Sequence, residues 1–236
     1  MDNNEQKIKV SGNHQLQCIF KKVPASELRL DDEFLKYQPK TKEEKKFKKL
    51  VENAIKNGLK DFWRPACDPS FNDDGSICYQ SGKKPAVGKS YKWWKENAKK
   101  FAPQCGCRLG TKSEYVAFIA VLINELVTSG KSIEWAWNAV CNDSKELGHY
   151  CNSTDNKRDF EPTGSREICG WYDLGNIYKI LAEDKEAGGY WFVGGHYKEN
   201  SDGVPLADLC VHGSFCYLFD NDNGCGWLVL DSCPDC

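Results

Sequence analysis

Cysteine thiols are the first side chains in this sequence whose number and spacing suggest chemistry. The chain has 13 Cys, and this odd number prevents every thiol from pairing within one chain. Cys105 and Cys107 are separated by one residue, and Cys233 and Cys236 form a CxxC pair. Two such pairs could form a structural zinc site. The alternative is that these cysteines are buried or free thiols, which behave as small apolar side chains.

Other patterns typical of active sites are weak. Asp73 and Asp74 lie in a segment rich in turn-forming residues and could contribute to a calcium site. Solvated loop carboxylates are the simpler interpretation of this pair. No Ser-His-Asp set, P-loop or GxGxxG motif stands out in the sequence.

A compositional anomaly lies between residues 200 and 226. This depleted interval contains no Lys, Glu, Gln, Met or Trp, although these five types form about a quarter of the chain and about seven would be expected from overall composition. Glu199 and Trp227 bound the interval. Every residue within it belongs to a type that a codon ending in a pyrimidine can encode.

The residue types that remain suit adaptable binding, because rigid aromatic rings supply contact area and small polar groups supply hydrogen bonds. Loops held by a rigid scaffold also tolerate substitution and carry recognition. We therefore predict a largely exposed ligand-binding surface, one side of which consists of His196, Tyr197, Asn200 and Asp202. The other side consists of Cys210, His212, Ser214, Cys216, Tyr217, Phe219, Asp220 and Asn221, while some of Val204, Pro205, Leu206 and Leu209 belong to the core.

Hydrophobic periodicity predicts the elements that must position this surface. Thr41 and Glu44 form a capping-box pattern, which predicts an amphipathic helix near 41–58 with a Lys-rich, solvated outer face. Two more helices are expected at about 90–101 and 111–129. Turn-forming residues predict a loop over 61–84, and the chain after Gly130 is expected to be irregular except for buried strands at 190–193 and 227–230. This order predicts an α+β fold.

Length, net charge and the distribution of apolar residues limit the kinds of partner that we expect for this chain. The 236 residues fit one large domain or one domain with an elaborated N-terminus. A net charge of −2 gives no global attraction to nucleic acid or to anionic membranes. No stretch reaches the ~18 apolar residues of a membrane span, and residues 1–10 lack the apolar core of a signal peptide. We expect a cytoplasmic protein whose partner is an unknown protein or other macromolecule, with no nucleic acid and no membrane insertion.

Five short blocks resemble, in order, those of the formylglycine-generating, or sulfatase-modifying, family. Residues 85–91 (PAVGKSY) and 108–115 (RLGTKSEY) resemble the entries into the family's two core helices. Residues 170–176 (GWYDLGN) resemble its Gly-Leu-Tyr-Asp-Met-x-Gly-Asn block with one residue missing. Residues 188–191 (GGYW) resemble Gly-Gly-Ser-Trp, and residues 226–229 (GWLV) stand where the family ends in Gly-Phe-Arg-Val.

This resemblance covers about residues 85–231 and implies a C-type-lectin-like fold, in which two core helices pack on a small, twisted antiparallel sheet and long loops present the functional face. It divides the chain into an N-terminal elaboration, residues 1–84, packed on a main domain of residues 85–236. The ligand-binding segment would be about 190–226. The chain departs from the family at Leu228, which replaces an Arg, and at Lys179 and Ile180, which replace Glu-Trp.

The enzymes of this family oxidise a substrate cysteine with a copper ion held by two cysteines. Cys210 and Cys216 fall in the corresponding interval, and two thiolates suit Cu(I). The resemblance thus implies an alternative function, a copper-dependent oxidase acting on a protein cysteine. Against it, the two cysteines are one residue further apart than in the enzymes, and no Arg follows Arg166. We therefore expect a binding protein without catalytic residues and without a cofactor, although a structural zinc or calcium ion stays possible.

The depleted interval adds a second resemblance. Its residue types are those that adenine-directed randomisation of Asn codons yields. The variable proteins of diversity-generating retroelements carry such a segment near the C-terminus of the same lectin-like scaffold. The fold blocks, the placement of the interval and its composition together resemble this class, which implies a hypervariable ligand-binding surface. The alternative interpretation is a polar loop that lacks five residue types by accident.

Overall fold

The structure is a computed structural model that describes residues 5–7, 19–153, 159–184, 186, 189–213 and 224–232; for 5–7, 19 and 210–213 only the backbone is described. The architecture is α+β, as the sequence predicts. The helices of the described residues are α1 Lys42–Lys56, α2 Tyr91–Phe101, α3 Lys112–Thr128 and α4 Ile133–Cys141, with 3-10 turns η1 Ala25–Glu27, η2 Glu33–Lys36 and η3 Pro103–Cys105.

Side-chain caps explain where the helices begin. The hydroxyl of Thr41 accepts a hydrogen bond from Glu44 N at 3.1 Å, and that of Thr111 accepts one from Glu114 N at 3.3 Å. Both form complete capping boxes, since each Glu carboxylate accepts a hydrogen bond from the backbone of the capping residue. The three predicted helices are therefore confirmed. The expectation of irregular chain after Gly130 is wrong for α4, a nine-residue helix too short to show a clear period.

The central sheet has the strand order β11–β10–β9–β12. Strand β10 runs antiparallel to both of its neighbours, whereas β12 runs parallel to β9. The expected antiparallel sheet is thus wrong at one edge, because β12 starts beside the first residue of β9 and continues in the same direction. The four strands are β9 Tyr178–Asp184, β10 Gly189–Val193, β11 Leu209–Gly213 and β12 Gly224–Gly226.

Smaller antiparallel sheets surround this one, with orders β1–β2–β3, β13–β6, β4–β5 and β7–β8. The predicted loop over 61–84 is wrong in part, because β3, β4 and β5 all lie in it. β4 and β5 have two residues each and form a hairpin around the predicted turn residues, so they are too short to show an alternating pattern, whereas β3 pairs with the distant β2. Their bounds are β1 Glu5–Lys7, β2 Ile19–Val23, β3 Phe62–Pro65, β4 Ser70–Phe71, β5 Ile77–Cys78, β6 Arg108–Leu109, β7 Glu167–Ile168, β8 Trp171–Tyr172 and β13 Leu228–Val229.

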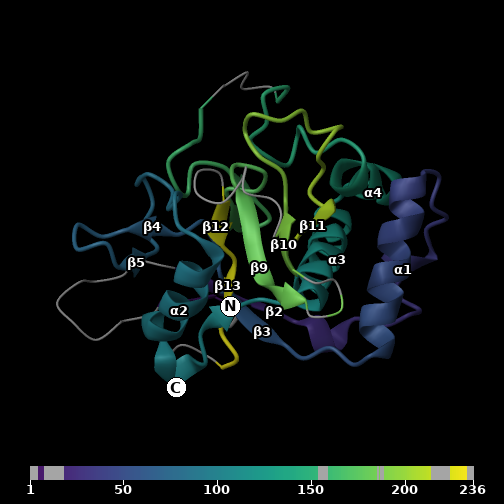
Figure 1. Cartoon of the computed structure of the whole chain (residues 1–236). Coiled ribbons are helices and arrows are strands. Elements are labelled where there is room, and N and C mark those ends of the chain that lie inside the picture. Colours follow the sequence, from purple (N-terminus) through teal and green to yellow (C-terminus); the bar gives the residue numbers. More distant parts are fainter. Residues whose placement is uncertain are drawn as a thin grey trace.

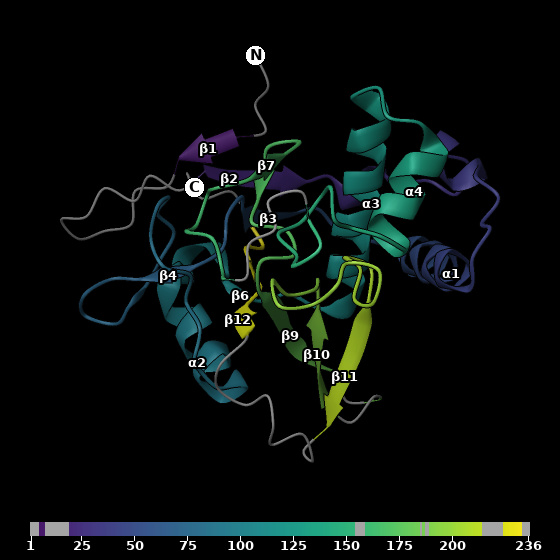
Figure 2. The ribbon, with the colours of Figure 1, turned by 90° about the horizontal axis from the view of Figure 1, so that it is seen from above.

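The central sheet separates two apolar cores. Alternate residues of β10 face opposite sides of a strand, so Trp191 and Val193 pack in the core that holds α3, whereas Phe192 packs with α2. Figures 1 and 2 show α2 and α3 on opposite sides of the strands. Both predicted helices thus pack against the C-terminal sheet. Trp191 and Trp227 are buried core residues, as the sequence predicts.

The N-terminal helix α1 joins the same core as α3. Phe47 and Val51 of α1 are buried in the cluster that contains Val116 and Ile119 of α3, and Figure 1 shows the two helices side by side. The outer face of α1 carries exposed lysines such as Lys45 and Lys49, as its pattern predicts. Within the described residues, no helix has the length and apolar character needed to cross a membrane.

Candidate functional site

The predicted site residues divide into three groups. The first group lies in the connection between β10 and β11, where Asn200 and Asp202 are exposed. His196 and Tyr197 are buried, with 3% and 6% of their surface exposed. The prediction of a largely exposed surface is therefore wrong for these two residues, because the chain leaves β10 in a tight turn and folds back over the sheet.

Glycines make this turn possible. Gly194 and Gly195 have φ angles of 90° and 74°, which L side chains rarely adopt. A Cβ atom on Gly195 would lie 2.1 Å from the hydroxyl of Tyr150. Tyr197 N then donates to Asn176 O at 3.1 Å. The start of the predicted surface is therefore fixed by backbone geometry and not by an open loop.

The second group, Cys210 and His212, lies in the edge strand β11. The Cα register pairs Cys210 with Phe192 and His212 with Tyr190 of β10. The third group lies outside the described residues and consists of Ser214, Cys216, Tyr217, Phe219, Asp220 and Asn221. Within the depleted interval, Pro205, Leu206 and Leu209 are buried, as expected, and Val204 is partly exposed.

His196 and Tyr197 of the first group belong to a continuous series of aromatic rings, which we call the aromatic row, and this row includes the Cα partners of the second group in β10. Successive ring centroids are 5.7, 4.3, 5.2, 6.0, 5.6 and 4.5 Å apart. These distances fall in or near the range that aromatic pairs prefer. Four of the rings, those of Phe160, Tyr178, Tyr190 and Tyr91, are partly exposed. The row consists, in order, of Phe160, Tyr197, His196, Tyr178, Phe192, Tyr190 and Tyr91.

Lysines cover both ends of the aromatic row. The amine of Lys84 lies 5.3 Å from the ring centre of Phe160, and that of Lys198 lies 5.3 Å from Tyr197. At the other end, Lys95 lies 5.6 Å from Tyr91. Rings that carry a cation offer apolar area, hydrogen-bonding groups and charge in one place. Sequence reasoning found only His196 and Tyr197 of this row, although the alternation of Tyr190 and Phe192 in β10 signals a shared face.

The imidazole of His196 is a titratable ring of the row, and its surroundings lower its pKa. Burial lowers the pKa of its imidazole to about 4, and the nearby cations of Lys198 and Lys179 contribute to the shift. The ring therefore carries no charge at neutral pH. Its Nδ1 lies 3.2 Å from Lys198 N, and its ring stacks on Tyr178 at 5.2 Å. These contacts suit a structural ring behind a binding surface.

A buried ionic cluster supports β9 beneath the row. Lys179 forms an ion pair with Asp68, and both side chains are buried. Burial disfavours the cation of Lys179, but the carboxylate of Asp68 holds the lysine pKa above its ordinary value. Asp173 accepts hydrogen bonds from Asp68 N and Gly164 N at 2.9 Å. Lys179 is one of the positions at which the chain departs from the family pattern. Its buried charge is paired with a carboxylate 111 residues away in the sequence.

Asp173 is the second ionisable group of this cluster that burial perturbs. Burial, together with the neighbouring charge of Asp68, raises the pKa of Asp173 to about 7. Its φ angle is 60°, a left-handed conformation that Asp tolerates better than most residues. Asp173 belongs to the GWYDLGN block, which contains β8, leads into β9 and is hydrogen-bonded to Ala66 and Asp68 in the segment that follows β3.

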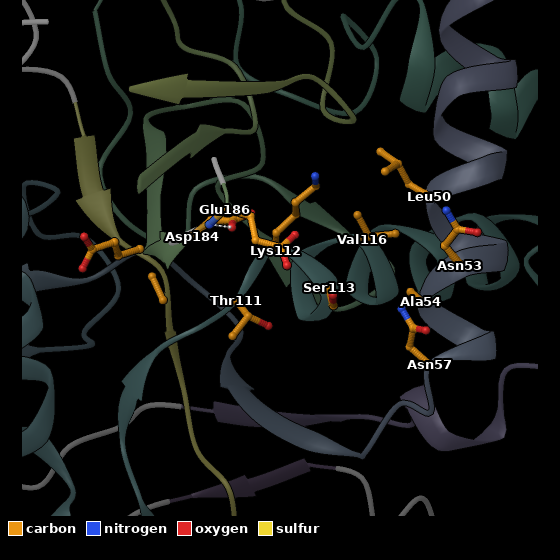
Figure 3. A pocket seen from close by; sticks show the side chains of 12 residues that line it. Leu50, Asn53, Ala54, Asn57, Thr111, Lys112, Ser113, Val116, Asp184 and Glu186 are labelled. Atoms are coloured by element: carbon orange, nitrogen blue, oxygen red, sulfur yellow. Dashed lines mark hydrogen bonds between the residues drawn. The ribbon is translucent and has the colours of Figure 1, made fainter. Parts of the chain in front are cut away.

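A separate cleft of about 570 Å³ lies between α1, the start of α3 and the end of β9 (Figure 3). Asn53 and Asn57 line it from α1, and Lys112 lines it from the start of α3. The amine of Lys112 lies 4.2 Å from the ring centre of Trp191, which faces the α3 side of β10. The cleft is therefore on the other side of the sheet from the aromatic row, and of the predicted site residues whose side chains the structure describes, none lines it.

The sequence suggests possible zinc, calcium and copper sites, and the described residues do not test all of them. Asp74 accepts hydrogen bonds from the backbone and the hydroxyl of Ser76 at 2.9 and 2.6 Å, as in a loop carboxylate that stabilises its own turn. Across the described part of the chain, no group of three or more His, Cys, Asp or Glu residues is arranged to hold a metal. Because Cys216, Cys233 and Cys236 lie outside that part, the copper alternative and the zinc site stay predictions.

Comparison with known proteins gives this chain no family. No protein-family model matches it, and no curated protein is significantly similar to it in sequence. The functional argument therefore depends on the residues and contacts above.

Proposed function

We propose that this chain is a ligand-binding variable protein of a diversity-generating retroelement, built on the formylglycine-generating-enzyme branch of the C-type-lectin fold. The observation that carries the proposal is the depleted interval, in which five residue types are absent over residues 200–226. The protein binds a macromolecular ligand and does not catalyse a reaction. The ligand is a property of the diversified residues and not of the scaffold.

The positions of the family blocks support the lectin-like scaffold. The block at 108–115 contains β6 and the cap of α3, and Arg108 binds Glu114 with donor–acceptor distances of 2.6 and 2.9 Å. The block at 226–229 contains β13, which pairs with β6. The first block ends at Ser90 and Tyr91, where α2 begins. Each block thus coincides with an element boundary, as a shared scaffold requires.

The anchoring of the undescribed segment 214–223 supports a diversified surface. The segment follows Gly213 in β11 and precedes Gly224 in β12, and these strands are the opposite edges of the central sheet. With strands about 4.8 Å apart, the two edges are about 14 Å apart across the sheet. Gly213 and Gly224 also lie at opposite ends of β9, because the register places Gly213 level with Asp184 and Gly224 beside Tyr178. Both ends are therefore held by a rigid sheet, which is the arrangement that lets a loop vary without unfolding its scaffold.

The aromatic row supports binding by the same face. Tyr190 and Phe192 belong to the row and are the Cα partners of His212 and Cys210. Aromatic residues that stay constant next to variable positions would give every variant the same apolar contact area for a ligand. Variation at neighbouring positions would then change specificity, as it does in antibody loops.

A combined replacement of surface residues tests this proposal. Replacing His212, Ser214, Phe219 and Asn221 together by other small or polar residues is expected to change the melting temperature by no more than about 4–8 °C, because each surface substitution costs about 0.5 kcal/mol or less and 1 kcal/mol shifts the melting temperature of a chain of this size by about 2–4 °C. Thermal unfolding followed by circular dichroism measures this. A phage library randomised at the same four positions, selected against a purified bait protein, should yield binders with retained folding.

Two outcomes contradict the proposal. If the fourfold variant unfolds as readily as a variant of a core tryptophan, the interval is core. If the displayed library loses resistance to protease in nearly all members, residue identity at these positions determines folding and the surface cannot be diversified.

A further inference from the structure

Helix α2 exposes a row of lysine side chains to solvent. Each residue of a helix is rotated by about 100° from the one before it, so the exposed residues of α2 fall on the side opposite the buried Trp94, Ala98 and Phe101. Four of the five exposed residues are lysines and one is a glutamate, which gives this side a formal charge of +3. The five residues, which we call the lysine ridge, are Lys92, Lys95, Glu96, Lys99 and Lys100.

Most of the charge on the lysine ridge is not neutralised by the described part of the chain. Lys95 lies 3.6 Å from Glu183, whereas Lys92, Lys99 and Lys100 have no ion-pair partner among the described residues. The net charge of −2, on which the expectation of no nucleic acid partner is based, averages over this local excess. Lysines that are close together and unpaired attract polyanions at short range.

Aromatic rings flank the ridge where α2 meets β4. The ring of Trp93 is partly exposed and lies 5.5 Å from that of Phe71, edge to face. The amine of Lys89 lies 5.3 Å from the ring centre of Trp93 and 5.5 Å from that of Phe71. Trp93 also packs at 5.1 Å on the buried ring of Trp94. Packing therefore holds a partly exposed indole next to a cation.

A second aromatic pair flanks the ridge where α2 meets the central sheet. The rings of Tyr91 and Tyr190 stack at 4.5 Å and are nearly parallel, and both are partly exposed. The amine of Lys95 lies 5.6 Å from the ring centre of Tyr91. Tyr91 and Trp93 are about 200° apart around the helix, and the exposed lysines lie between them. The ridge is thus a cationic surface with aromatic rings on both sides.

Phosphate groups next to unpaired bases are the chemistry that matches this surface. Proteins that bind single-stranded nucleic acid combine a cationic path for the phosphates with aromatic rings on which bases stack. A duplex or an acidic peptide offers its charges to the lysines but no free base to the indole of Trp93. The ridge has no Arg, whose guanidinium binds one anion in a fixed geometry, so its lysines suit a flexible chain of phosphates.

We propose that the lysine ridge and the aromatic pairs beside it bind single-stranded nucleic acid without sequence preference. The phosphates contact Lys92, Lys99 and Lys100, and a base stacks on the exposed part of Trp93. These contacts use groups that DNA and RNA share, so we expect no preference for either sugar. All four residues lie outside the depleted interval, and this second surface does not depend on the proposed function.

Binding of a fluorescently labelled oligo(dT) of about 20 nucleotides to the full chain tests the proposal. Fluorescence anisotropy is expected to give a dissociation constant of about 1–100 µM at physiological salt. Replacing Lys92, Lys99 and Lys100 together by Gln should weaken binding at least about tenfold. The slope of log affinity against log salt should become shallower by about 2, since each lost phosphate contact removes about 0.7.

The matched control removes three exposed lysines of α1, by replacing Lys45, Lys49 and Lys56 with Gln. Both triple variants change the net charge equally, and Figures 1 and 2 show α1 and α2 on opposite sides of the molecule. The α1 variant should bind oligo(dT) within about twofold of the wild type. The fourfold variant of the proposed variable surface should also keep this affinity, so the two proposals can fail separately.

Trp93 distinguishes a nucleic acid from an acidic protein as the partner. Trp93→Leu should weaken oligo(dT) binding about fivefold to a hundredfold, and Trp93→Phe, which keeps a ring, should weaken it less. Circular dichroism checks that both variants fold. The proposal is overturned if the wild type does not bind oligo(dT), if the two triple variants lose affinity equally, or if folded Trp93→Leu binds as tightly as the wild type. Polyglutamate of similar length that binds as tightly as oligo(dT) would assign the ridge to an acidic protein instead.

Discussion

Replacing Lys179 by Met is expected to lower the free energy of unfolding by about 3–5 kcal/mol, because removal of one partner leaves the other charge buried and unpaired. Asp68 is 2% exposed, and Lys179 is its ion-pair partner in the described part of the chain. Lys179 also lies in β9, where its Cα partner is Cys225 of β12. Urea unfolding at neutral pH measures the loss.

Two further variants show that the loss comes from the buried charge. Lys95→Met makes the same change at an exposed pair, since Lys95 and Glu183 are 3.6 Å apart with about half of each side chain exposed. That pair is expected to contribute about 0–1 kcal/mol. The double variant Asp68→Asn/Lys179→Met should be less destabilised than the sum of the single variants. Equal losses in Lys95→Met and Lys179→Met would contradict this account of β9.

Replacing Trp227 by Ala is expected to destabilise the protein by about 3–5 kcal/mol, the usual cost of deleting a large buried ring. Trp227 directly follows the depleted interval and is 3% exposed. Its ring lies 5.4 Å from that of Tyr115 and 5.9 Å from that of Phe62. Gly110 leaves room for this ring, because a Cβ there would lie 2.3 Å from it. Chemical unfolding measures the change.

The matched control is Trp135→Ala on α4, where the indole is only partly buried. It should cost clearly less than Trp227→Ala, since less apolar area is lost. The affinity of folded Trp227→Ala protein for a ligand that binds the proposed surface should equal that of the wild type. The measured affinity must first be corrected for the unfolded fraction of the variant. A selective loss of affinity without a loss of stability would place Trp227 in the binding surface and not in the scaffold.

Local signals predicted three of the four helices in the described part of the chain, and missed the nine-residue α4. The capping boxes at Thr41 and Thr111 and the apolar spacing that follows them are short-range patterns, and α1 and α3 begin at the next residue. The buried strand at 190–193 was also predictable, because its apolar residues are contiguous. These elements form from information within about 15 residues, which a single sequence contains.

The parts that sequence reasoning missed depend on distant partners. Strand β3 has four residues and pairs with β2, about 40 positions earlier, so no periodic pattern reveals it. The role of Lys179 depends on Asp68, 111 residues away. His196 and Tyr197 have the residue types of a binding loop, but the turn at Gly194 and Gly195 buries them. The binding surface that composition predicts stays a prediction, and the tertiary contacts show that these two side chains are not exposed on it.

The central claim is that the depleted interval is diversified by a retroelement, and the most direct measurement is the sequence of the DNA around the gene. We expect a nearby second copy of the segment that encodes about residues 190–230, next to a reverse transcriptase gene. The copy should differ from the gene mainly where it carries adenines, and Asn codons should mark the variable positions between 200 and 223. Long-read sequencing of many isolates should show substitutions concentrated at these codons. A gene without such a copy, whose interval is as constant among isolates as the codons for Trp191 and Trp227, would contradict the account.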